Sequence, residues 1–243
     1  MYLCPVHRWA IVVAAGSALV LAWHAAINAA LIVPPMPGPM PSATADEVFA
    51  VHFAWLRDIA FHDLGVRLLA AWTFLALAGL GHAMTVPVDA NAGPSTAAWS
   101  ATMSTAGRLL IVAGLFGALG QLVELGGHQA AIAASASLAP PALVAMIEFF
   151  IDQVGTAIAT TAWGLFGLAA LVCAVAARGR LAIPAIALGG ALLVMVGSRL
   201  IDDPADIAGT LLFVTGFVLV PLWALSLLAM GRPSAQPDRP LPA

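Results

Sequence analysis

The residues of this sequence that are best suited to chemistry form two pairs, each with a spacing of four. Glu124 and His128 make the first pair, and Glu148 and Asp152 make the second. Residues four apart lie on one face of a helix, so each pair can share a metal ion or a proton. We therefore predict that these four residues are catalytic or metal-ligating, and that His62 is a further candidate metal ligand.

Each pair also has a purely structural interpretation. An arginine can neutralise Glu124 and fix helix packing, because a lone charge in the membrane costs at least about 2.5 kcal/mol. Glu148 and Asp152 stand at the expected start of a helix, where acidic residues complement the helix dipole. Arg67 and Arg199 are the natural counter-charges. We predict that at least one of them forms a salt bridge with one of these three acids.

A third set of polar residues suggests a bound cofactor. His24 and Asn28 share one face of the first apolar stretch, and Gln121 lies one turn before Glu124. An intramembrane histidine can ligate a haem or relay protons, so His24, Asn28 and Gln121 are candidate cofactor-binding residues. The alternative for His24 is a hydrogen bond to a neighbouring helix.

The polar faces of the different helices are expected to meet, since hydrocarbon offers polar groups no hydrogen-bond partner. They would then enclose a cavity in the outer half of the membrane. Gly114 and Gly117 continue the face of Gln121 and should let a neighbouring helix approach closely. The expected lining of the cavity comprises His24, Asn28, Gln121, Glu124, His128, Glu148, Asp152 and Gln153.

The elements that must position these residues are transmembrane helices. The 243 residues are 62% hydrophobic and only 9% charged, whereas about a quarter of the residues in a soluble domain are charged. A transmembrane helix needs roughly 20 apolar residues. Such stretches lie at about 9–33, 64–86, 106–127, 153–177, 181–200 and 207–230. The sequence therefore predicts an all-α polytopic membrane bundle of about six transmembrane helices, in a single domain over residues 1–231.

The segments between these stretches have features of their own. Prolines over residues 34–41 predict an extended spacer. Thr44 and Glu47 then fit a capping box, and a helix over residues 45–62 with one apolar side is expected to lie in the outer membrane interface. We also expect a cytoplasmic loop over 87–105, an outer connection over 129–152, a kink at Pro221 and a disordered cytoplasmic tail over 232–243.

The placement of arginine predicts the orientation of the bundle. With the N-terminus inside, Arg178 and Arg180 fall in a short cytoplasmic turn, as the positive-inside rule favours. The other arginines on that side are Arg8, Arg108, Arg232 and Arg239, against Arg57, Arg67 and Arg199 outside. We predict a multi-pass cell-membrane protein with both termini cytoplasmic. The first apolar stretch has a second interpretation as a signal peptide, which would leave the other orientations unchanged.

Composition and motifs narrow the function without fixing it. A net charge of −3 gives no nucleic-acid footprint, and the sequence has no nucleotide-binding loop, H-E-x-x-H or G-x-S-x-G motif. The first interpretation is a membrane binding or accessory protein whose acidic pocket holds a cation, a cofactor or a polar-headed lipophile. The second is an enzyme of isomerase, cyclase or hydratase type acting on a lipophilic substrate. The third is a proton- or cation-coupled transporter. The expected partners are the lipid bilayer and either a larger membrane complex or a lipophilic small molecule.

Overall fold

The predicted all-α membrane bundle is confirmed. The computed structural model describes residues 5–27, 37–38, 43–86, 94–136, 140–177, 179–200 and 207–230. Within these ranges the elements are α1 (Pro5–Ile27), α2 (Ala45–Thr85), α3 (Pro94–Ser135), α4 (Pro141–Ala176), η2 (Gly179–Leu181), α5 (Ala182–Leu200), α6 (Ile207–Val214), η3 (Thr215–Leu219) and α7 (Val220–Met230). Six stretches of these helices are long and apolar enough to cross a membrane. Asn28 and the tail over 232–243 lie outside the described residues.

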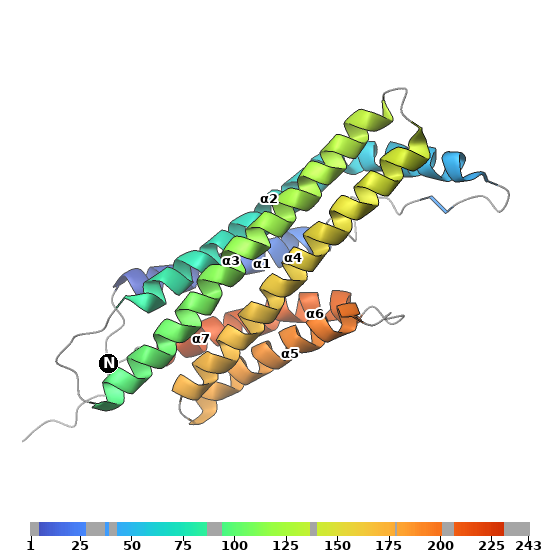
Figure 1. Ribbon diagram of the computed structural model, residues 1–243. Coiled ribbons are helices and arrows are strands. Elements are labelled where there is room, and N and C mark those ends of the chain that lie inside the picture. Colours follow the sequence, from blue (N-terminus) through green and yellow to red (C-terminus); the bar gives the residue numbers. More distant parts are fainter. Residues whose placement is uncertain are drawn as a thin grey trace, which may run out of the picture.

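The six spans form a closed ring in which neighbours along the chain are neighbours in space. α1 packs on α2, α2 on α3, α3 on α4 and α4 on α5. The last span, made of α6, η3 and α7, contacts both α5 and α1 and closes the ring. Figure 1 shows α3 and α4 side by side, with α5, α6 and α7 gathered along one half of α4. Short connections between antiparallel neighbours are typical of helical bundles.

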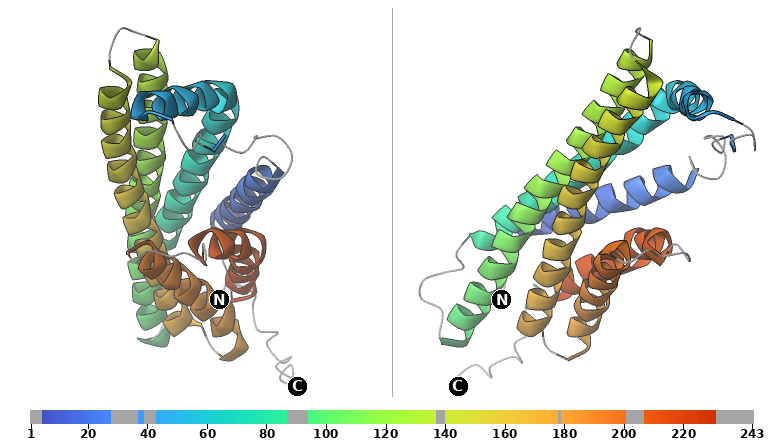
Figure 2. Two further views of the ribbon diagram at one scale, coloured as in Figure 1. Left: turned by 90° about the vertical axis from the view of Figure 1, so that its right-hand side faces the viewer. Right: turned by 45° about the vertical axis from the view of Figure 1, so that its right-hand side comes forward.

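α3 and α4 are longer than the apolar stretches predicted for them. α3 has 42 residues, which gives a length of about 63 Å at 1.5 Å per residue, roughly twice the hydrocarbon thickness. The expected loop at 87–105 is helical from Pro94, and the expected connection at 129–152 is helical up to Ser135 and again from Pro141. The Ala-rich flanks explain the difference, because alanine has the highest helix propensity. The tip of the α3–α4 hairpin extends beyond the ends of α1 and α6 (Figure 2).

α2 combines two elements that were expected to be separate. Its first turn is closed by the predicted capping box, in which Glu47 N donates to Thr44 Oγ1 and Thr44 N donates to Glu47 Oε2. The helix then bends and continues to Thr85 instead of ending near His62. The apolar side of the first part packs on the α3–α4 hairpin instead of facing lipid. A small second core forms there from Phe53, Leu56, Ile59, Ala131, Val144 and Ala145.

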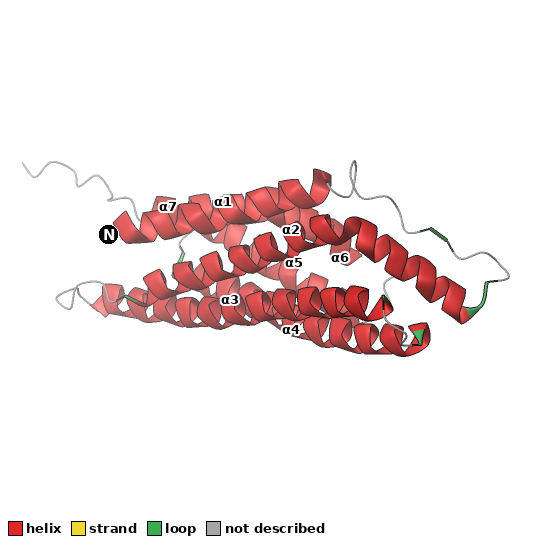
Figure 3. Ribbon diagram, turned by 90° about the horizontal axis from the view of Figure 1, so that it is seen from above, coloured by secondary structure: helices red, strands yellow, loops and turns green. Residues whose placement is uncertain are grey.

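The last span is interrupted where a kink was expected. Pro221 has no N–H to bond the preceding turn, and the helix widens just before it into the π turn η3 (Thr215–Leu219), where Val220 N bonds Thr215 O. Despite this interruption, the helices run roughly along one common axis (Figure 3). A π turn inside an α-helix frequently accompanies a functional site.

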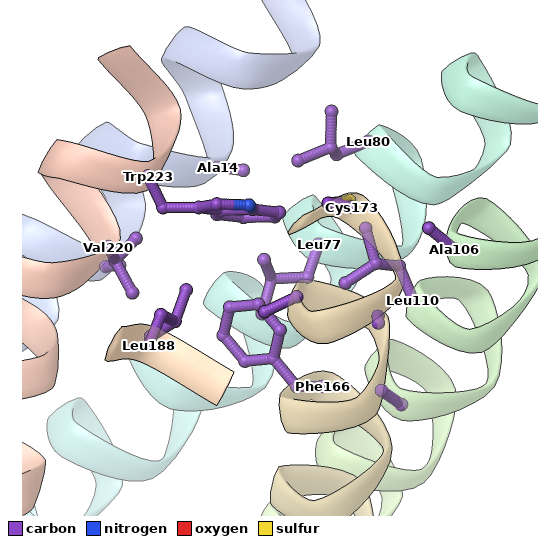
Figure 4. Close-up of a cluster of buried hydrophobic side chains, with 14 of the residues drawn as sticks. Ala14, Leu77, Leu80, Ala106, Leu110, Phe166, Cys173, Leu188, Val220 and Trp223 are labelled. Carbon is purple, nitrogen blue, oxygen red and sulfur yellow. The ribbon is translucent and has the colours of Figure 1, made fainter. Parts of the chain in front are cut away.

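Small residues hold the ring together. Lipid is as apolar as leucine, so membrane helices associate through close van der Waals packing. Gly114 and Gly117 on α3 lie against Phe74 of α2, and a Cβ on either glycine would overlap that residue. The close approach predicted for this glycine face is thereby confirmed. Between the spans, buried apolar side chains form a core around Leu77, Phe166 and Trp223 (Figure 4).

Candidate functional site

Three helices each contribute one pair of polar residues to a single cluster. The pairs are Asp63 and Arg67 on α2, Glu124 and His128 on α3, and Asp152 and Thr156 on α4. Each pair has a spacing of four, so both members lie on the helix face that points to the other two helices. We call these six residues the polar ring.

Ion pairs and hydrogen bonds join the members of the polar ring in one series, from Thr156 through Glu124, Arg67, Asp63 and His128 to Asp152. Arg67 Nη1 forms an ion pair with Glu124 Oε2, and Arg67 Nε lies 3.3 Å from Asp63 Oδ1. Asp63 Oδ2 lies 2.9 Å from His128 Nδ1, and His128 Nε2 lies 3.8 Å from Asp152 Oδ1. Thr156 Oγ1 donates to Glu124 Oε1 over 3.3 Å. The predicted salt bridge between an arginine and Glu124 is confirmed, with Arg67 as its donor.

Glycine makes room for the most buried member of the polar ring. Glu124 is only 4% exposed, and its Cγ occupies the position that a side chain on Gly155 would need. Gly155 and Gly120 also bring α3 and α4 into backbone contact, since a Cβ on Gly120 would lie 3.0 Å from Gly155 O. The carboxylate is thus held in a slot between two helices, with Arg67 and Thr156 as its partners.

Glu148 does not join the polar ring, which corrects its predicted place in the cavity. Its Oε2 lies 3.0 Å from His52 Nε2 on the first part of α2. The helix continues through this region, so Glu148 stands two turns into α4 and one turn before Asp152, beside the second core. The pair connects the bent start of α2 to the α3–α4 hairpin.

The two members of the Glu124–His128 pair bond to α2 and not to each other. Glu124 contacts Arg67, and His128 contacts Asp63. These contacts do not support the metal ion that Glu124 and His128 were predicted to share. Among the described residues, no group of three or more His, Cys, Asp and Glu side chains has a geometry that could hold a metal ion. His62 makes an edge contact with the ring of Phe61.

The candidate cofactor-binding residues fall in different places. Gln121 lines the same cavity as Glu124 and Asp152. His24 lies against Gly65 of α2, with its Nε2 3.4 Å from the position of a Cβ there. That nitrogen is buried and has no hydrogen-bond partner among the described residues, so the expected bond to a neighbouring helix is not found. Gln153 is exposed, because it lies about 100° around α4 from Asp152.

A cavity of about 450 Å³ lies between the six spans, next to the polar ring. Its polar end is formed by Arg67, Gln121, Glu124, Asp152 and Thr156, with Arg199 at the end of α5. Its remaining wall is mostly apolar and partly aromatic, and includes Phe74, Trp163, Phe166 and Phe213. The expected convergence of polar faces on one cavity is confirmed for Gln121 and Glu124 of α3 and Asp152 of α4, whereas His24 and His128, which were also expected there, do not line the cavity.

Sequence reasoning overlooked Asp63 and Thr215. Asp63 orients both Arg67 and His128, and its spacing of four from Arg67 was a visible sign that the two share a helix face. Thr215 lines the cavity from the π turn. A lone threonine in an apolar stretch carries no comparable pattern.

Comparison of the chain with protein-family models, with curated proteins and with solved structures finds no match. The cavity and the polar ring are therefore the features from which a function can be inferred.

Proposed function

We propose that this chain is a multi-pass cell-membrane protein that binds a lipophilic small molecule with a polar head group in the cavity between its six spans. The single observation that carries the proposal is the division of the cavity wall. One end presents two guanidinium groups, two carboxylates, an amide and a hydroxyl, while the rest is mostly aliphatic and aromatic. A volume of about 450 Å³ falls in the range of small-molecule sites, which is roughly 300–1,000 Å³.

The polar ring supports a neutral or zwitterionic head group better than a free cation. Arg67 already neutralises Glu124 and contacts Asp63, and His128 lies between Asp63 and Asp152. Such a network offers both donors and acceptors to a ligand. An isolated cation would be repelled by Arg67 and Arg199, which both line the cavity.

Mass spectrometry of the intact protein tests this proposal even when the identity of the ligand is unknown. The full chain, extracted in mild detergent, is expected to carry a lipophile into the gas phase. Glu124→Gln should lower its occupancy at least tenfold, because a hydrogen bond to a charged group contributes about 1.5–3 kcal/mol and 1.4 kcal/mol corresponds to tenfold. Folding should survive, since Arg67 keeps Asp63 as a partner.

Arg108→Gln is the matched control. Arg108 is exposed on the same helix, away from the cavity lining, and its replacement should leave the bound lipophile unchanged. A wild type that carries no lipophile, or a Glu124→Gln protein that carries as much as the wild type, would contradict the proposal.

One observation favours an enzyme acting on such a lipophile as the second candidate. Asp63 holds His128 through Nδ1, and Nε2 lies 3.8 Å from Asp152, which lines the cavity although His128 does not. A histidine oriented by a carboxylate is a common general base. If this candidate holds, His128→Gln should retain the bound molecule and accumulate unconverted substrate, which chromatography of the extracted molecule separates from the product even when an isomerisation or cyclisation leaves the mass unchanged.

We infer in addition that both termini are cytoplasmic, so that the cavity lies in the outer half of the membrane. The inference is supported by the arginines around the α4–α5 turn, Arg178 and Arg180. A reporter enzyme that works only in the cytoplasm should be active when it is fused after Gly231. Activity of a periplasmic or extracellular reporter at that position would reverse the orientation.

A further inference from the structure

Thr215 carries an unsatisfied hydroxyl in the wall of the cavity. The residue is 2% exposed and lines the cavity at the first position of the π turn. Its Oγ1 is buried and has no hydrogen-bond partner among the described residues. A buried hydroxyl without a partner is costly, so its presence in this position calls for an explanation.

Four other threonines among the described residues satisfy their hydroxyls within their own helix. In each case the hydroxyl donates to the carbonyl four residues earlier, as happens at Thr73, Thr102, Thr105 and Thr161, over 2.9–3.0 Å. Thr215 makes no such bond, although it also follows a full helical turn, α6 (Ile207–Val214). Its hydroxyl is therefore free to serve a partner within the cavity.

The helix that carries Thr215 is fixed against α1. A Cβ on the next residue, Gly216, would lie 2.7 Å from Ala22 Cβ, which shows how closely the two helices approach. Thr215 thus lines the cavity from a span that cannot come closer to α1 without overlap. A binding group held in this way loses little freedom when a ligand arrives.

Aromatic rings make up part of the same wall. Phe74 and Trp163 have ring centroids 4.9 Å apart, and Trp163 is stacked on Phe166 at 6.3 Å with an interplanar angle of 28°. All three line the cavity together with Phe213. Aromatic side chains pack favourably on the face or edge of another planar ring. This part of the wall suits a planar ring better than a flexible alkyl chain.

We propose that the Thr215 hydroxyl donates a hydrogen bond to a ring carbonyl of the ligand, and that the ligand is a lipophile of the quinone class. This inference rests on the proposed function. It adds that the aromatic part of the cavity takes a planar ring and that Thr215 recognises its oxygen. A quinone provides the planar ring, the acceptor oxygen and an apolar tail in one molecule.

Two probes and three variants test the inference. The full chain in detergent micelles is titrated calorimetrically with a decyl-substituted 1,4-benzoquinone and with decylbenzene, which has the same tail and no oxygen. Thr215→Val should weaken binding of the quinone about three- to tenfold, the range of a neutral hydrogen bond, and leave binding of decylbenzene unchanged. Thr215→Ser, which keeps the hydroxyl, should bind the quinone like the wild type.

Thr161→Val is the matched control, because Thr161 is exposed and its hydroxyl is satisfied by Ala157 O. It should change neither affinity. Thr215→Val should also unfold at the same or a higher temperature than the wild type, since it removes a buried unpaired hydroxyl, whereas loss of a structural hydrogen bond would lower that temperature.

Equal quinone affinity in Thr215→Val and the wild type would overturn the inference, as would an equal loss for both probes. Absence of saturable quinone binding by the wild type would also overturn it. In that case the proposed function would still be tested separately, by mass spectrometry of the lipophile bound to the wild type and to Glu124→Gln.

Discussion

Arg67→Met is expected to lower the free energy of unfolding by about 3–5 kcal/mol, because removal of one partner from a buried ion pair leaves the other charge without compensation. Glu124 is 4% exposed, and its remaining partner is the hydroxyl of Thr156. Asp63 would lose its contact with Arg67 as well. The measurement is a denaturation titration in mixed micelles, followed by circular dichroism.

The cause of this destabilisation can be isolated with a double mutant. In Arg67→Met/Glu124→Gln the uncompensated carboxylate is gone, so the protein should be more stable than Arg67→Met alone, although a second substitution has been added. Arg57→Met is the control, since Arg57 is an exposed arginine on the same helix and should shift the unfolding free energy by less than about 0.5 kcal/mol. A double mutant no more stable than Arg67→Met would show that the Glu124 charge is not the cause.

Hydropathy predicted which parts of the chain cross the membrane, but not how far the helices extend. The apolar stretches at 106–127 and 153–177 lie almost entirely inside α3 (Pro94–Ser135) and α4 (Pro141–Ala176). Hydropathy measures transfer into lipid, which ends at the headgroups, while the helix continues as long as its residues favour it. For this reason the start of α2, predicted as a separate interfacial helix, packs on the extended hairpin instead.

The polar ring was predictable from spacing only within each helix. A separation of four places Glu124 and His128 on one helix face. In the structure both side chains lie on the face of α3 that contacts α2. Partners on other helices depend on how the helices are rotated and shifted, which spacing does not contain. Glu148 shares a face with Asp152 and still bonds His52, because it lies one turn closer to the start of α4, beside the bent start of α2.

A close backbone crossing of α2 and α3 gives the second prediction of large effect. Gly81 of α2 and Gly107 of α3 meet backbone to backbone. A Cβ on Gly81 would lie 2.8 Å from both Ile111 N and Leu110 Cβ, and closer still to Gly107 O. Backbone atoms cannot move aside as a flexible side chain can, so Gly81→Val should separate α2 from α3 and abolish the folded protein in detergent.

Gly79→Val provides the control two residues away on the same helix. Nothing lies within 4 Å of a Cβ on Gly79, and the residue is exposed, so valine there should meet only lipid and leave the folded yield near that of the wild type. Yield is measured as the monodisperse fraction in size-exclusion chromatography after detergent extraction. Separation of α2 from α3 would also pull Arg67 away from Glu124, so any Gly81→Val protein that is recovered should carry no lipophile. A monodisperse Gly81→Val protein with wild-type yield would show that α2 and α3 do not cross where Gly81 meets Gly107.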